Sequence, residues 1–228
     1  MLVSRVTPFG FNCLAASLFS VCFLSNSNAQ TNTVRAVDGG VTLQRGDKSM
    51  PAKVGMRLRQ GDKIISPVGA EVLLRFNDGA RLAVRSDSEI QLKALQTTGP
   101  GTAQKKTIRL LVGALRFVSG IATVSRNVSF ETRTATIGIR GTDIEISVSE
   151  VEVLDNNPGT YLKVNSGAAQ ITAPDGAAVE VAPGEVAYGG EPELQTRGAG
   201  GTRRSSARKL QAVGGSLFAP ASMDALMR

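Results

Sequence analysis

Apolar and polar residues alternate with a period of two in several short runs of this chain. The clearest runs are residues 70–76, 108–112 and 144–148, where Val, Ile, Leu, Ala and Phe occupy every second position. Successive side chains of a β-strand point to opposite faces, so this period predicts strands with one buried and one solvated face. The expected fold class is therefore all-β.

Turn signals separate these runs at short intervals. Clusters rich in glycine, aspartate, asparagine or proline occur at residues 38–40, 45–47, 60–62, 77–79, 155–159, 174–176 and 183–185. Glycine and asparagine tolerate the left-handed backbone of tight turns, so this spacing predicts many short strands. Before Ser205 no stretch shows convincing helical periodicity.

A weak internal repeat refines the expected architecture. Residues 37–43 and 56–62 are echoed by residues 164–171 and 179–185, and in each copy a strand follows a glycine turn and a later strand ends at glycine plus an acidic residue. Such self-similarity indicates either stacked β coils, as in a β-helix or solenoid, or a pseudo-symmetric double sheet. Alternation alone does not separate these two forms.

Composition excludes several kinds of chemistry. The chain has no histidine, and both of its cysteines, Cys13 and Cys22, lie near the N-terminus. The remainder therefore lacks thiolate nucleophiles, imidazole bases and the usual zinc ligands. We expect no catalytic residue, no metal and no cofactor. An enzyme acting on a glycan or peptide stays open as an alternative, and it would need carboxylates that converge in a cleft.

Residues 1–29 have the organisation of a secretory signal peptide. Arg5 precedes an apolar run at residues 9–24, which is shorter than the roughly 20 residues that a membrane-spanning helix requires. Small residues at Ser27 and Ala29 predict cleavage before Gln30. The mature chain is therefore expected in the periplasm or outside the cell.

The most distinctive motif is Gly-Ile-Arg-Gly-Thr at residues 138–142, where two glycines three positions apart flank one arginine. Glycine within a β-prone segment permits a bulge or a close backbone contact. With the turn at residues 76–79 and the Gly-Asp pair at residues 61–62, this motif resembles the FecR domain. The resemblance covers roughly residues 37–148, with a weaker continuation to about Tyr188.

This resemblance implies a stacked β-helix-like fold and a non-catalytic module of the cell envelope. Such a module would bind an envelope protein or a glycan, with signalling as one of its implied roles. FecR-type regulators also carry a cytoplasmic segment that binds a sigma factor, and they have one membrane helix. The stretch before residue 30 is too short for such a segment, which argues against direct contact with a sigma factor.

Arg140 has two interpretations. Its guanidinium could bind a carboxylate of a ligand or partner through a bidentate fork. It could instead be structural, bonded to turn carbonyls and to an acid such as Asp143 or Asp78, and this is the interpretation we favour. The other motif residues are predicted to be structural as well: Asp78, Gly79, Gly138, Gly141 and Thr142.

The expected organisation is a signal peptide at 1–29, a FecR-like β domain at 30–188 and a flexible basic tail at 189–228. The domain comprises a core at 37–148 and a repeat-like extension at 160–188, and a short helix is expected at 220–228. The chain's net charge is +7, and tail candidates for contact with an anionic membrane or lipopolysaccharide are Arg203, Arg204, Arg208 and Lys209. The basic run of the tail has no interleaved aromatic residues, which argues against nucleic acid as a partner.

The expected function is a non-catalytic periplasmic or secreted protein that binds a protein or glycan in the cell envelope. A structural or adhesive envelope scaffold is the first alternative, because the same stacked strands would also serve assembly.

Overall fold

The computed structural model describes residues 31–96, 104–120, 126–152, 156–191, 206–211, 217–218 and 220–227. The expected signal peptide, Arg203 and Arg204 lie outside this part of the chain. The described elements are β1 (Thr33–Asp38), β2 (Thr42–Arg45), β3 (Lys48–Pro51), β4 (Lys63–Ser66), β5 (Glu71–Arg75), β6 (Arg81–Val84), β7 (Ser88–Gln96), β8 (Gln104–Val118), β9 (Arg126–Glu131), β10 (Thr136–Ser149), β11 (Gly159–Thr172), β12 (Ala178–Val181), β13 (Val186–Gly189), β14 (Ala207–Leu210) and the 3-10 helix η1 (Ser222–Met227). The all-β prediction is confirmed.

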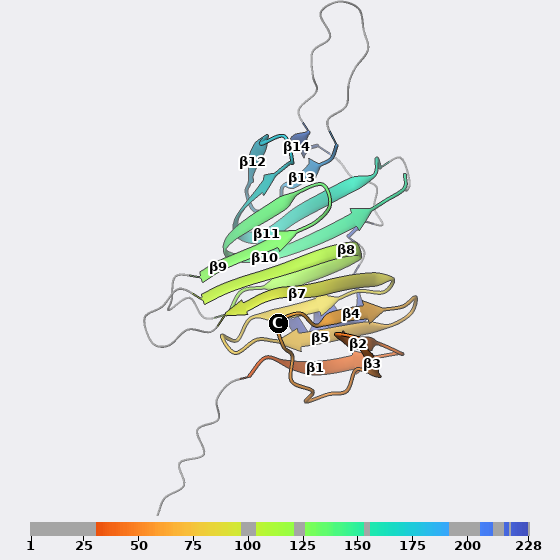
Figure 1. Ribbon diagram of the computed structural model, residues 1–228. Coiled ribbons are helices and arrows are strands. Elements are labelled where there is room, and N and C mark those ends of the chain that lie inside the picture. The colour runs from red at the N-terminus through yellow and green to blue at the C-terminus, as the bar shows by residue number, and fades with distance from the viewer. Residues whose placement is uncertain are drawn as a thin grey trace, which may run out of the picture.

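The strands form one open sheet, with β1 to β3 at one end of the molecule and β12 to β14 at the other (Figure 1). The three longest strands change partners along their length. The first part of β8 pairs with β7 and β9, and its last part pairs with β6 and β10. Likewise, β10 pairs first with β9 and then with β8, and the two parts of β11 pair with β13 and β12.

This exchange of partners folds the sheet into two layers. Layer 1 contains β3, β2, β4, β7, the first part of β8, β9, the first part of β10, the last part of β11 and β12. Layer 2 contains β1, β5, β6, the last parts of β8 and β10, the first part of β11, β13 and β14. All pairings except the parallel β8–β9 pair are antiparallel. Of the two forms that the sequence leaves open, the pairing therefore matches the double sheet, because stacked coils would require parallel neighbours.

Glycines occupy the corners where the long strands pass between layers. In β10 the corner is Gly141, with φ +57°, and in β11 it is Gly167, with φ +82°. The β10–β11 register shifts between Arg140 and Asp143, at these corners. Left-handed backbone is costly for residues with a Cβ, so glycine lets both strands bend at the same place.

Side chains from both layers pack into one core. Leu43, Ile64 and Ile90 of layer 1 belong to the same buried cluster as Val72 and Ile144 of layer 2. Phenylalanines also contribute: the Phe117 ring centroid lies 5.2 Å from that of Phe130 and 6.5 Å from that of Phe76. Each fully buried side chain of this size contributes roughly 1.5–3 kcal/mol, so the apolar face of each strand is the main source of stability.

Parts of the segment expected to be a flexible tail lie against the domain. Strand β14 pairs with β13. Met223 and Met227 of η1 pack on Leu73 and Ala83, on the outward face of layer 2. These parts pack on the domain because they bury apolar side chains, which the basic composition of the segment did not indicate. Among the described residues, no helix has the length and apolar character needed to cross a membrane.

Candidate binding groove

A groove of about 770 Å³ runs along β9 to β12 and reaches β14. It contains three of the residues that the sequence singled out, Gly138, Arg140 and Lys209. Other lining residues are Ser129, Ala168, Gln170 and Glu180.

Small residues form the floor of this groove. Gly138 pairs with Ser129 of β9 on one side and with Gln170 of β11 on the other, and Arg140 pairs with Ala168. A Cβ added to Gly138 would meet no atom within 4 Å, and its backbone is not left-handed. Packing therefore does not require glycine here. The effect of Gly138 is to leave backbone accessible on the groove floor.

Arg140 is exposed, and no hydrogen bond or ion pair joins it to another described residue. The two acids considered as its partners bind other cations. Asp143 accepts hydrogen bonds of 3.0 and 2.7 Å from Arg116, and Asp78 accepts bonds of 3.1 and 3.0 Å from Lys106. Neither of these acids is therefore an ionic partner of Arg140 in the described part of the chain. Its guanidinium donors face solvent at the groove.

Strand β14 brings a second cation to the groove. Lys209 Nζ lies 2.6 Å from a carboxylate oxygen of Glu185, and this bond lowers the pKa of Glu185. Arg208 instead lies over the ring of Tyr188, 4.5 Å from its centroid, so it packs on the domain. Of the four basic tail candidates, only Lys209 is placed at the groove among the residues that the structure describes.

A family model described as FecR protein matches residues 62–187, which is more than half of the chain. The chain belongs to the FecR family. No curated protein matches it.

Two crystal structures of a putative anti-sigma factor from Parabacteroides distasonis ATCC 8503, at 1.65 and 2.50 Å resolution, resemble the FecR chain at low identity. The first shares 12% identity with a TM-score of 0.45, and the second shares 11% with a TM-score of 0.46. In both cases the match covers 64% of this chain and 59% of the other.

The Gly-Ile-Arg-Gly-Thr motif at residues 138–142 of this FecR chain lies at the corner where β10 passes between the layers, and most of its residues have structural roles there. Ile139 is buried in the core, Gly141 bends β10, and the backbone N–H of Thr142 donates a 2.9 Å hydrogen bond to Ser119 Oγ. Asp78 lies in the β5–β6 turn, as predicted, and accepts a 3.0 Å bond from the N–H of Ala80. Among the signature residues that line the groove, Gly138 and Arg140 are exposed and Ile139 is buried.

The sequence did not reveal a charged network on the outward face of layer 2. Glu145 accepts hydrogen bonds of 2.6 Å from Arg85 and 3.1 Å from Lys163. Asp224 of η1 accepts a 3.1 Å bond from Arg85 as well. The hydrogen bond with Asp143 raises the pKa of Arg116. Charged residues at outward positions of neighbouring strands were the available signal, but their partners depend on the register and on η1.

Proposed function

We propose that this FecR-family chain is a non-catalytic, exported module that binds a protein partner through the groove around Arg140. The observation that supports this proposal most directly is the exposed Arg140 guanidinium, which has no partner among the described residues. FecR domains are signalling-related regulatory modules of the envelope, and such modules act by binding. Residues 1–29 would direct this chain to the periplasm or the medium.

The charges around the groove favour a polypeptide over a polyanion. Arg140 and Lys209 lie with the acids Glu180 and Glu185 on the same side of the molecule. A uniformly anionic surface such as lipopolysaccharide would be repelled by the two carboxylates. Lys209 and Glu185 already pair with each other, and a protein segment that carries both signs of charge can complement Arg140 and Glu180.

Strand β12 offers a second means of binding. Among the described strands it pairs only with β11, so its other edge is available beside the groove. An extended segment can add to such an edge through backbone hydrogen bonds, while side-chain contacts provide specificity. Arg140 lies on β10, two strands from this edge, so it would bind an acidic side chain of a part of the partner that lies in the groove beside the added segment.

The proposal can be tested by placing a photo-crosslinking amino acid at Gln170 of the mature protein in the producing cell. We expect one discrete crosslinked protein, which is then purified for affinity measurements. Arg140→Ala should reduce its affinity at least about tenfold, because a charge-assisted hydrogen bond contributes roughly 1.5–3 kcal/mol.

A matched control separates recognition from folding. Arg133 is exposed in the turn before β10, outside the groove, so Arg133→Ala should change neither affinity nor stability. Arg140→Ala should also leave the free energy of unfolding within about 0.5 kcal/mol, as is usual for exposed sites. Unchanged affinity in Arg140→Ala would show that the partner binds elsewhere.

A further inference from the structure

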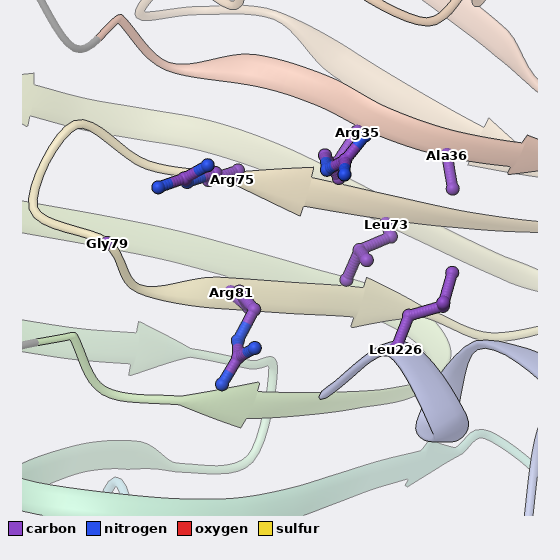
Figure 2. Close-up of a pocket in the computed structure, with 7 residues that line it drawn as sticks. All are labelled: Arg35, Ala36, Leu73, Arg75, Gly79, Arg81 and Leu226. Carbon is purple, nitrogen blue, oxygen red and sulfur yellow. The ribbon is translucent and has the colours of Figure 1, made fainter. Parts of the chain in front are cut away.

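A second pocket, of about 400 Å³, lies at the other end of the molecule, where β1, β5 and β6 meet η1 (Figure 2). Three arginines line it: Arg35 of β1, Arg75 of β5 and Arg81 of β6. Leu73 and Leu226 contribute apolar surface beside them. None of these residues lines the groove around Arg140, so the two sites are separate.

Strand pairing brings the backbone positions of these arginines close together. Arg75 and Arg81 are direct cross-strand partners in the β5–β6 pair. Like charges directly opposite one another in a sheet are destabilising. Arg35 is the extra residue of the register shift between Val34 and Ala36, and it adds a third positive charge to the pocket lining. The described residues that line the pocket include no acid.

The surrounding surface argues against a merely solvated cluster. On the same face of layer 2, the neighbouring cations are paired: Arg85 with Glu145 at 2.6 Å and Arg116 with Asp143 at 2.7 Å. By contrast, neither Arg35 nor Arg75 has a hydrogen bond or ion pair with a described residue. The chain thus pairs its cations beside η1 but leaves Arg35 and Arg75 without an ionic partner among the described residues, as an anion-binding site requires.

We propose that this pocket binds a phosphate group, either as the free ion or as a monoester. Guanidinium groups match the oxygens of phosphate through pairs of parallel hydrogen bonds. One arginine is sufficient for a carboxylate, whereas Arg35 and Arg75 together suit a dianion with three terminal oxygens. The apolar surface of Leu73 and Leu226 would contact the group that carries the phosphate.

Isothermal titration calorimetry of the mature protein tests this site with three probes. Inorganic phosphate represents the free ion, glucosamine 1-phosphate represents a soluble monoester, and vesicles containing phosphatidic acid represent a membrane headgroup. Unphosphorylated glucosamine is the blank. We expect at least one phosphate probe to bind, with an affinity that falls as salt is added, because the attraction is between exposed charges. The strongest of the three identifies the source of the phosphate.

Variants decide whether the arginines cause the binding. Arg75→Gln and Arg35→Gln should each reduce affinity at least about tenfold, since a charged hydrogen bond is lost. Arg75→Lys should lose less affinity, because lysine keeps the positive charge but cannot form the pair of parallel hydrogen bonds. Arg133→Gln and Arg140→Gln should bind phosphate like the unmodified protein.

The proposal is overturned if no phosphate probe binds, or if Arg133→Gln weakens binding as much as Arg75→Gln does. Either outcome leaves the groove around Arg140 unaffected, because its test uses a different partner and different variants. Arg35 and Arg75 are exposed, so their replacement should not unfold the protein, and a thermal melt of each variant checks this.

Discussion

Replacing Gly167 by alanine should destabilise the fold more than the same replacement at Gly138 or Gly141 of β10. Its φ of +82° is left-handed, which costs a residue with a Cβ about 1–2 kcal/mol. A Cβ at this position would also collide with the Gly141 carbonyl oxygen and lie 2.8 Å from Thr142 Cγ2 and 2.9 Å from Thr142 Cα. Overpacking of this kind typically costs about 1–3 kcal/mol.

The expected loss for Gly167→Ala is therefore about 2–5 kcal/mol, out of a total stability of roughly 5–15 kcal/mol. Gly141 and Gly138 supply internal controls. At Gly141 the backbone is left-handed, with φ +57°, but a Cβ would meet nothing within 4 Å, so Gly141→Ala should cost only about 1–2 kcal/mol. Gly138→Ala has neither problem and should stay within about 0.5 kcal/mol of the parent.

Urea unfolding of the mature protein, followed by circular dichroism, measures all three losses. The expected order of destabilisation is Gly138→Ala, then Gly141→Ala, then Gly167→Ala. Equal losses at Gly138 and Gly167, or a smaller loss at Gly167 than at Gly141, would refute the argument that these glycines let the sheet fold over.

Further predictions concern the buried charges, η1, alkaline pH and processing. Glu145→Gln should cost about 1–3 kcal/mol in urea unfolding, because it removes one of the two carboxylates that bind the buried Arg85, while the exposed Glu180→Gln should cost little. Asp224→Asn should loosen η1 and speed cleavage of the C-terminal segment in limited proteolysis. Burial raises the pKa of Tyr161 to about 12, so the folded state keeps a proton that the unfolded chain loses near pH 10. The free energy of unfolding should therefore fall between about pH 10 and 12. Thermal melts of Tyr161→Phe should lack that fall. Mass spectrometry of the protein from its producing cell should find Gln30, or a residue next to it, at the N-terminus.

Local pattern was enough to predict the strands. The period-two runs at residues 70–76, 108–112 and 144–148 lie in or beside β5, β8 and β10, and their apolar positions are in the core except Val112, which is exposed. Side-chain alternation is a property of the extended backbone itself, so it can be detected without tertiary contacts. The same alternation places Arg140 opposite the buried Ile139, which is consistent with its exposure.

The sequence also predicted that Gly141 has a structural role, but it did not indicate the reason. Its left-handed φ is a local property, whereas the bend matters because Gly167 of β11 faces it across the pair. Similarly, Asp78 was predicted as a turn residue, while its ion pair with Lys106 of β8 was not predicted. In both cases the residue that explains the role, Gly167 or Lys106, comes from a strand that is distant in the sequence.

Sequence by itself thus determined the fold class, the positions of the turns and the family signature. Only the tertiary structure decided that Lys209 lies at the groove with Arg140, that Asp224 reaches Arg85, and that Arg75 lies opposite Arg81. The physical reason is register: which residues face each other across strands depends on bulges and on the order of pairing, and a shift of one residue would exchange every neighbour.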